Sequence, residues 1–253
     1  MVLKGKVAAI TGGTKGIGRG IAEAFLKEGA LVAISSRSKE HGEALLREIA
    51  AGDRLIYVES DASKREDVDR FLDETERRLG PIDIVVNNVA GSTPAPLAEM
   101  TDENWHDTLA LSLSSAFYGT RRALQLMIPR RSGRVINIGS AAAKTAFAGL
   151  AAYTTAKHGL LGLTRSAALE TGELGITVNA ICPGPIVTDM ARGAAAALGI
   201  TVDQFFEPVV SRGVTKKFNT TQEIGAVAVL LASEAGAGIT GTAISVDGGI
   251  ALD

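Results

Sequence analysis

Short apolar runs alternate with longer amphipathic segments along the whole chain. Seven of the apolar runs predict buried strands, because each is short and is followed by turn residues; they are Val7–Thr11, Leu31–Ser35, Arg54–Val58, Ile82–Asn87, Gly133–Ile138, Ile176–Ile181 and Ala243–Val246. Segments with apolar residues at helical spacing predict helices at Gly16–Lys27, Ser38–Ala50, Ser63–Leu79, about Asp102–Pro129, Ala151–Gly172 and Gln222–Ala232.

The predicted strands are almost continuously apolar and are separated by helices. This order is typical of a parallel sheet that helices cover on both faces. We therefore expect one α/β domain over residues 1–253. Only the stretch from Thr188 to about Thr220 departs from the alternation; it is Ala- and Gly-rich and then carries Phe205-Phe206. A long insertion of this kind predicts a lid over a binding site.

A glycine-rich loop, Thr11-Gly12-Gly13-Thr14-Lys15-Gly16-Ile17-Gly18, separates the first predicted strand from the first predicted helix. Glycine lets the main chain approach a phosphate closely, and the free N–H groups at a helix start attract anions. The spacing Gly-x3-Gly-x-Gly differs from the Gly-x-Gly-x2-Gly of many dinucleotide folds. The loop indicates a pyrophosphate site, although a tight turn without a ligand would also need these glycines.

The end of the second predicted strand distinguishes between the two nicotinamide cofactors. An acidic residue there would bind a ribose 2′-hydroxyl, whereas an arginine accommodates a 2′-phosphate. The strand ends in Ser35-Ser36-Arg37, and Lys15 lies in the glycine loop. These two cations favour NADP(H) over NAD, unless both are only solvated surface charges.

Tyr153 and Lys157 are four residues apart in a predicted helix and so share one helix face. An ammonium beside a phenol, together with an oxidised nicotinamide, is expected to lower the phenol pKa and to suit it to proton transfer. Ser140 follows the fifth predicted strand, at the sheet edge where such folds bind ligands, and its hydroxyl could hold a substrate oxygen. A Tyr-x3-Lys pair alone is a weak signal; the glycine loop makes it specific.

Composition narrows the class of protein further. The net charge is −2 and no basic block occurs, which argues against a nucleic-acid partner. Cys182 is the only cysteine, so an internal disulfide and a cysteine-built metal site are excluded, and His41, His106 and His158 lack metal-ligand spacing. No apolar stretch predicts a membrane span and no signal peptide is recognised. We expect a cytoplasmic protein with no metal.

Taken together, these motifs resemble the short-chain dehydrogenase/reductase family over essentially the whole chain. The resemblance rests on the following residues in the family's order: Thr11-Gly12-x3-Gly16-Ile17-Gly18, Asp61, Asn87-Asn88, Ser140, Tyr153, Lys157, Asn179, Pro183-Gly184, Thr188 and Asp247-Gly248-Gly249. It implies a Rossmann-type doubly wound domain with a seven-stranded parallel sheet. It also implies a homotetramer, with the Asp247-Gly248-Gly249 segment at a subunit contact.

The resemblance implies a role for each matching position. Tyr153 would be the general acid or base, Lys157 would lower its pKa and bind the nicotinamide ribose, and Ser140 would position the carbonyl. The implied cofactor contacts are Gly12, Thr14, Lys15, Gly16, Ile17, Gly18, Ser36, Arg37, Asp61, Ala62, Asn88, Val89, Ala90, Tyr153, Lys157, Pro183, Gly184, Ile186 and Thr188.

Two positions depart from the family's pattern. Ala90 stands where glycine is usual, and Ser112 stands where the family has an asparagine that helps to hold a water in the proton path to Lys157. We therefore expect a working enzyme whose proton relay at Ser112 is altered.

The sequence resembles 3-oxoacyl-carrier-protein reductases and related ketoreductases, and our leading hypothesis is therefore NADPH-dependent reduction of a ketone or the reverse reaction. A 3-hydroxybutyrate-type dehydrogenase is an alternative, and a cofactor-binding regulator with weakened catalysis is a third hypothesis of another class. The substrate is expected to be a small carbonyl compound or alcohol, whose identity the variable loops do not reveal.

Overall fold

The computed structural model describes residues 1–197 and 199–252. Its strands form one seven-stranded sheet in the order β3-β2-β1-β4-β5-β6-β7, and all neighbouring pairs are parallel. The strands are β1 (Val7–Thr11), β2 (Leu31–Ser36), β3 (Leu55–Glu59), β4 (Ile84–Asn87), β5 (Gly133–Ile138), β6 (Ile176–Pro183) and β7 (Ala243–Val246). The expected α/β fold with a seven-stranded parallel sheet is confirmed.

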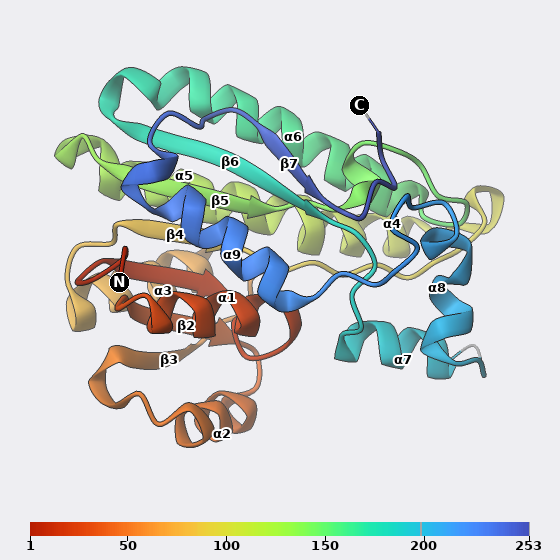
Figure 1. Cartoon of the computed structure of the whole chain (residues 1–253), viewed down its shortest axis with the longest axis horizontal. Helices are drawn as coiled ribbons and strands as arrows, with labels where there is room; N and C mark the ends of the chain where they lie inside the picture. Colours follow the sequence, from red (N-terminus) through yellow and green to blue (C-terminus); the bar gives the residue numbers. More distant parts are fainter. Residues whose placement is uncertain (198, 253) are drawn as a thin grey trace.

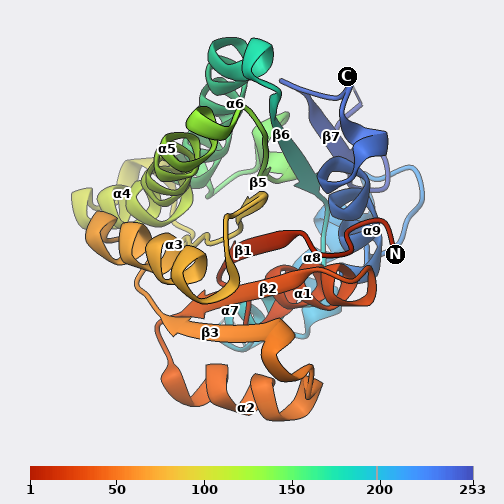
Figure 2. The ribbon, with the colours of Figure 1, turned by 90° about the vertical axis from the view of Figure 1, so that its left-hand side faces the viewer.

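Helices cover both faces of this sheet, as the end-on view in Figure 2 shows. One face carries α1 (Gly16–Lys27), α2 (Lys39–Ile49) and α9 (Thr221–Ala232), and the other carries α3 (Arg65–Leu79), α5 (Ser115–Met127) and α6 (Ala151–Thr171). Successive strand residues point to opposite faces. Ile84 and Val86 thus pack in the core under α1 and α9, whereas Val85 packs under α3 and α5. Two buried faces explain why the strands are continuously apolar.

The chain reverses its direction of progress across the sheet at β1. Ile10 pairs with Ile34 of β2 on one side and with Val86 of β4 on the other. Open α/β sheets bind ligands in the crevice beyond the carboxyl ends of the strands at such a reversal. The glycine loop follows β1 at this point, and Asn88 follows β4.

The helix predicted over Asp102–Pro129 is interrupted in the structure. It consists of α4 (Asp102–Leu109), a π-helical turn (Ala110–Ser114) and α5, which ends before a short 3-10 turn that contains Pro129. The Ser115 N–H donates to the Ala110 carbonyl, five residues back, so the turn holds one residue more than an α-helix would. The other predicted strand and helix boundaries differ from the observed ones by at most two residues.

The segment predicted as a lid folds into two short helices, α7 (Asp189–Ala197) and α8 (Val202–Val210), in a small lobe beside the main body (Figure 1). The expected lid also includes Leu198, which lies outside the described residues. Thr201 begins α8 with a capping box that includes Gln204. The Phe206 ring packs on Phe218 with centroids 5.7 Å apart, which ties α8 to the chain that leads back to α9. Within the described ranges, no helix is long and apolar enough to cross a bilayer.

Candidate active site

The glycine loop brings main chain rather than side chains to the crevice. Gly12 and Gly16 have φ angles of 66° and 53°, a left-handed conformation that favours glycine. A Cβ on Gly12 would lie 2.9 Å from the Asn88 side-chain nitrogen, and a Cβ on Gly18 would collide with the Gly12 carbonyl. The surface that a ligand meets here is therefore backbone.

The start of α1 presents a positive end to this loop. Lys15 is the N-cap in an extended conformation, and in the described structure neither a side-chain cap nor an acid in the first turn neutralises the helix start. Unpaired N–H groups and the helix dipole favour an anion at such a position. The residues present here fit a dinucleotide's pyrophosphate, because the exposed backbone and the positive helix start would both face its negative charge.

Asn88 joins the end of β4 to the glycine loop. Its side-chain amide donates hydrogen bonds to the carbonyls of Thr11 (3.0 Å) and Gly12 (3.1 Å), and its backbone N–H donates to the Thr11 hydroxyl (3.0 Å). The sequence-predicted segment Asn88-Val89-Ala90 thus lies directly beside the loop. The partly buried side chains of this segment border the crevice.

The residues predicted to bind the adenosine end of the cofactor lie directly after β2 and β3. The Gly13 N–H donates to the Ser35 carbonyl (3.1 Å), which brings the glycine loop to the end of β2. Arg37 and Lys15 are exposed, and within residues 1–197 and 199–252 neither has an ion pair. Asp61 is held in a turn, where it accepts bonds from the backbone and hydroxyl of Ser63 at 3.1 and 2.8 Å.

Ser140, Tyr153 and Lys157 come together where β5 ends against α6. The Ser140 hydroxyl accepts a bond from the Ala142 N–H (3.1 Å) and is hydrogen-bonded to the Tyr153 phenol. The Lys157 ammonium is buried, donates to the Ile138 carbonyl (2.7 Å) and lies 5.6 Å from the centre of the Tyr153 ring. The structure thus places the three sequence-predicted side chains in one group.

Burial sets the proton affinities in this group. Burial raises the pKa of the Tyr153 phenol above its ordinary value, and the hydrogen bond with Ser140 opposes this in part. Burial also lowers the pKa of Lys157 to about 8. Among the protein's own groups the net shift of the Tyr153 pKa is therefore upward and not downward as expected, because removing the phenol from water has the largest effect.

Ser112 lies in the π-helical turn with an exposed fraction of only 1 %. Its hydroxyl donates to the Gly91 carbonyl (2.7 Å) and accepts from the Gly91 N–H (3.1 Å). Both backbone groups of Gly91 are thus held by one side chain. The structure therefore assigns Ser112 a contact with the segment after β4, next to Asn88-Val89-Ala90.

The predicted nicotinamide contacts follow β6. Gly184 lies so close to neighbouring chain that a Cβ there would be 2.6 Å from the Asn219 side-chain oxygen and 2.7 Å from the Asp247 Cα. Ile186 is buried, and the Thr188 hydroxyl accepts a bond from the Ala191 N–H (3.3 Å). A Cβ on Gly16 would lie 3.2 Å from the Thr188 methyl, so this segment approaches the glycine loop.

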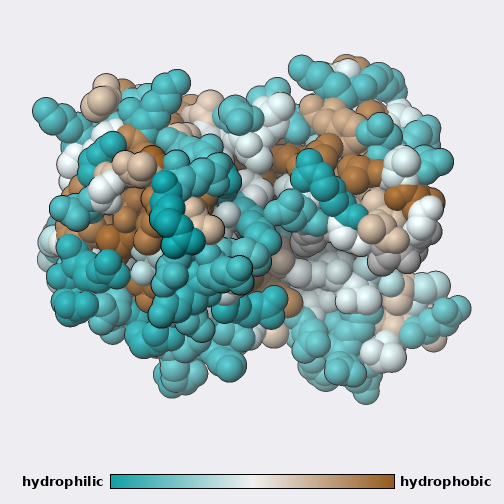
Figure 3. Space-filling view, turned by 90° about the horizontal axis from the view of Figure 1, so that it is seen from below, coloured by the Kyte–Doolittle hydropathy of each residue, from teal (hydrophilic) through white to brown (hydrophobic). Residues whose placement is uncertain are grey.

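A hollow separates the main body from the smaller lobe in the space-filling view from below (Figure 3). Its floor is pale, which means that the residues there are neither strongly hydrophilic nor strongly hydrophobic. The surface of the main body beside it is mostly hydrophilic. This is the shape expected for a cofactor that lies across the carboxyl ends of the strands.

Asn137 is a supporting residue that the sequence analysis missed. It is fully buried in β5, accepts from the Asn87 amide (2.8 Å) and donates to the Thr164 hydroxyl of α6 (2.9 Å). It therefore ties β4, β5 and α6 together beneath the site. An asparagine inside the apolar run Gly133–Ile138 was the available signal, since a buried amide needs partners.

Known proteins match this chain along nearly its whole length. The family model described as enoyl-(acyl carrier protein) reductase matches residues 12–251. A D-beta-hydroxybutyrate dehydrogenase from Cupriavidus necator is 37% identical over 254 residues, which are 98% of this chain and 98% of that protein. A 3-oxoacyl-[acyl-carrier-protein] reductase from Haemophilus influenzae is 33% identical over 250 residues, with 99% and 100% covered.

A solved structure agrees with these sequence matches. The crystal structure of an actinorhodin polyketide ketoreductase variant with NADPH has a TM-score of 0.91 and 30% identity to this chain, and 98% of each chain is covered. The chain belongs to the short-chain dehydrogenase/reductase family. It is therefore a member of an oxidoreductase family with a Rossmann-type fold, as its motifs indicated.

Proposed function

We propose that the protein is an NADP(H)-dependent oxidoreductase that interconverts a ketone, such as a 3-oxoacyl group, and a secondary alcohol. The observation that carries this proposal is the hydrogen bond between the Ser140 hydroxyl and the Tyr153 phenol. Two hydroxyl groups that meet at the ligand edge of a parallel sheet can both bind one carbonyl oxygen. The names of the relatives, a hydroxybutyrate dehydrogenase and a 3-oxoacyl reductase, support the same class of reaction.

Exposed cations support NADP(H) as the cofactor. Arg37 at the end of β2 and Lys15 in the glycine loop are the residues that would hold a 2′-phosphate, and no acid takes the place of Arg37. When bound, the reduced cofactor supplies a hydride to the carbonyl carbon. The similar ketoreductase that crystallised with NADPH is consistent with this choice.

Each side chain of the group has a defined task in this proposal. The Ser140 hydroxyl donates a hydrogen bond that orients the substrate carbonyl. The Tyr153 phenol gives its proton to the carbonyl oxygen as the carbon becomes an alcohol carbon, and in oxidation the Tyr153 phenolate accepts the alcohol proton. The Lys157 ammonium favours that phenolate and would bind the ribose of the cofactor.

A 3-hydroxybutyrate-type dehydrogenase remains the second candidate, because the Cupriavidus necator relative carries that name. Arg37 favours NADP(H) as the cofactor for this candidate as well. The homotetramer, the cytoplasmic location and the role of residues 188–220 as a lid are part of the same proposal. If the protein were a regulator that has lost catalysis, Tyr153 would serve only as a packing residue.

The test measures turnover and cofactor binding separately. The protein is assayed with ketones, β-ketoacyl thioesters and secondary alcohols, each with NADP(H) and NAD(H), beside Tyr153→Phe. We expect NADPH-dependent reduction of at least one ketone class, with the variant losing turnover about 100-fold or more while binding NADPH normally. Equal turnover by the variant would refute the role of Tyr153 as the acid or base. Absence of NADPH binding would refute NADP(H) as the cofactor.

A further inference from the structure

The turn that carries Arg37 is held from two sides, and Tyr57 of β3 acts on one of them. The Tyr57 hydroxyl donates a hydrogen bond to the Ser36 carbonyl (2.9 Å), which also accepts from the Ser60 N–H (3.0 Å). Tyr57 pairs with Ile34 in the sheet, and its side chain reaches further along β2 to the residue just before Arg37. The backbone at Arg37 thus depends on a side chain from the neighbouring strand.

The start of α2 fixes the other side of the turn. The Ser38 hydroxyl is the N-cap of α2 and accepts from the His41 N–H (3.2 Å), and the Ser38 carbonyl accepts from the Ser36 hydroxyl (3.2 Å). The residues before and after Arg37 are therefore both fixed by hydrogen bonds, whereas the Arg37 side chain itself is exposed.

The Tyr57 ring also contacts α2, at a position where only glycine leaves room for it. A Cβ on Gly42 would collide with the ring. Gly42 lies inside α2 and is not among the residues with a positive φ. The close approach of the ring, and not the backbone conformation, therefore accounts for a glycine in this helix, where alanine would be more favourable. The contact with α2 holds the ring in place, with its hydroxyl at the Ser36 carbonyl.

We propose that Tyr57 is a positioning residue for the choice of cofactor, because its hydroxyl holds the Ser36 carbonyl and so places Arg37 where it meets the 2′-phosphate of NADP(H). This role rests on the cofactor preference proposed above. A guanidinium binds a phosphate through two N–H groups in a fixed geometry, so a displaced Arg37 backbone weakens the contact. NAD(H) has no phosphate at this position, and its affinity should not depend on Tyr57.

The test compares the Kd for NADPH with the Kd for NADH, each from calorimetric titration of the full chain. Tyr57→Phe removes the hydroxyl and keeps the ring against Gly42. We expect it to weaken NADPH binding roughly three- to tenfold and to change NADH binding by less than about twofold. Gly42→Ala, which displaces the ring, should cause the same selective loss. Tyr118→Phe on α5 is the matched control; it removes a phenol hydroxyl on the opposite face of the sheet and should change neither affinity.

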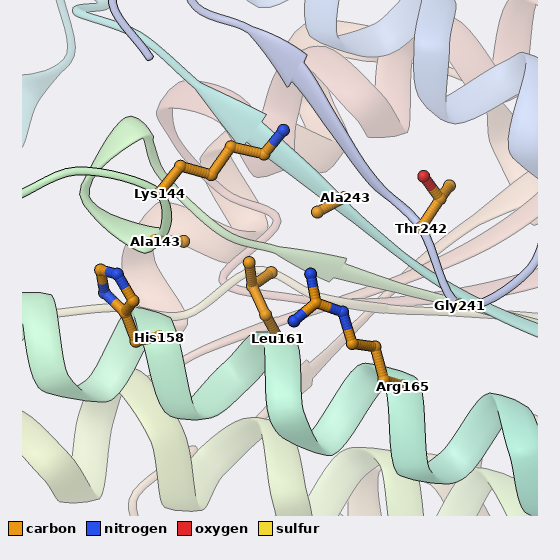
Figure 4. Close-up of a pocket in the computed structure, with 8 residues that line it drawn as sticks. All are labelled: Ala143, Lys144, His158, Leu161, Arg165, Gly241, Thr242 and Ala243. Atoms are coloured by element: carbon orange, nitrogen blue, oxygen red, sulfur yellow. The ribbon is translucent and has the colours of Figure 1, made fainter. Parts of the chain in front are cut away.

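The same comparison in a protein without Arg37 tests whether Tyr57 acts through it. In Arg37→Ala, adding Tyr57→Phe should weaken NADPH binding by less than about twofold, because the contact that the hydroxyl positions is already absent. Arg165→Ala controls for the loss of a positive charge, since Arg165 is exposed and lines a cavity beside β7, at the opposite edge of the sheet from β3 (Figure 4). In Arg165→Ala, Tyr57→Phe should keep its full effect.

Two results would overturn the role of Tyr57 and leave the proposed cofactor intact. In the first, the wild type prefers NADPH, and Tyr57→Phe weakens neither cofactor or weakens both equally. In the second, Tyr57→Phe weakens NADPH binding as much without Arg37 as with it. Equal wild-type affinities for NADPH and NADH would instead refute the proposed NADP(H) preference, and this role with it. Circular dichroism verifies that each variant is folded.

Discussion

At the scale of single residues, the buried ammonium of Lys157 connects the site to the stability of the fold. Burial lowers its folded-state pKa to about 8 from the ordinary 10.5, the value to which unfolding returns it. Between pH 8 and 10 the unfolded chain thus binds more protons than the folded chain, and the free energy of unfolding rises with pH. The contribution of Lys157 amounts to about 2 kcal/mol over this range.

Lys157→Met is the variant that isolates this effect, because it shares all other titrating groups with the wild type. We expect the wild-type free energy of unfolding to gain about 2 kcal/mol relative to Lys157→Met as the pH rises from 8 to 10. Urea titrations at several pH values measure this difference. Parallel pH dependences of the two proteins would mean that Lys157 titrates as it does in water.

Arg37 has a separate consequence for the choice of cofactor. One charge-assisted hydrogen bond contributes roughly 1.5–3 kcal/mol. Arg37→Ala should therefore raise the KM for NADPH by roughly 10- to 100-fold and change the KM for NADH by less than about twofold. Steady-state kinetics with both cofactors measure this, and equal effects on the two would show that Arg37 does not contact a 2′-phosphate.

The sequence was sufficient to choose Ser140, Tyr153 and Lys157, because helical spacing and strand order fix where these side chains lie. The sequence was not sufficient to predict the direction in which the pKa of Tyr153 is shifted. That property depends on how deeply packing buries the phenol, which motif spacing does not report. Asn137 was missed for a similar reason, since its partners Asn87 and Thr164 are distant in the sequence and meet only in the fold.

At the scale of elements, the π-helical turn determines what Ser112 contacts. Ser112→Ala removes both bonds to Gly91. We expect the free energy of unfolding to fall by roughly 1 kcal/mol and the KM for the cofactor to rise, because the segment after β4 loses its support. Ser114→Ala in the same turn is the matched control, since the Ser114 hydroxyl has no hydrogen-bond partner in the described part of the chain.

Chemical unfolding and cofactor titration of the two serine variants give the comparison. Equal stability of Ser112→Ala and Ser114→Ala would contradict the support of Gly91 by Ser112. Ser112→Asn tests the proton relay separately, and an unchanged rate and pH profile would mean that this position has no part in it.

Element boundaries show where sequence patterns lose information. The strands were predictable because burial on both faces makes them apolar throughout. The π-helical turn was not, since apolar residues continue at near-helical spacing through Ala110–Ser114. Helices α7 and α8 were also missed, because their alanines and the Thr201 cap lie in a segment whose length suggested a loop.

At the scale of the whole molecule, Arg212 connects the small lobe with the loop between Ser140 and Tyr153. Its guanidinium lies 5.2 Å from the centre of the Phe147 ring, and its Nη2 donates to the Thr145 hydroxyl at 3.4 Å. If the lobe acts as a lid, these contacts favour its closed position. An exposed cation–π contact contributes roughly 0.5–1 kcal/mol.

Arg212→Ala should therefore raise the KM for the substrate by roughly two- to fivefold and leave the KM for the cofactor unchanged. Thr145→Val removes only the weaker bond and should have a smaller effect, whereas Phe147→Leu should reproduce most of the loss. In the double variant, which combines Arg212→Ala with Phe147→Leu, the two increases in the KM for the substrate should not add, because both substitutions remove the same contact. Additive effects would mean that the two side chains act on the substrate independently, and the lobe would then not be held closed through this pair.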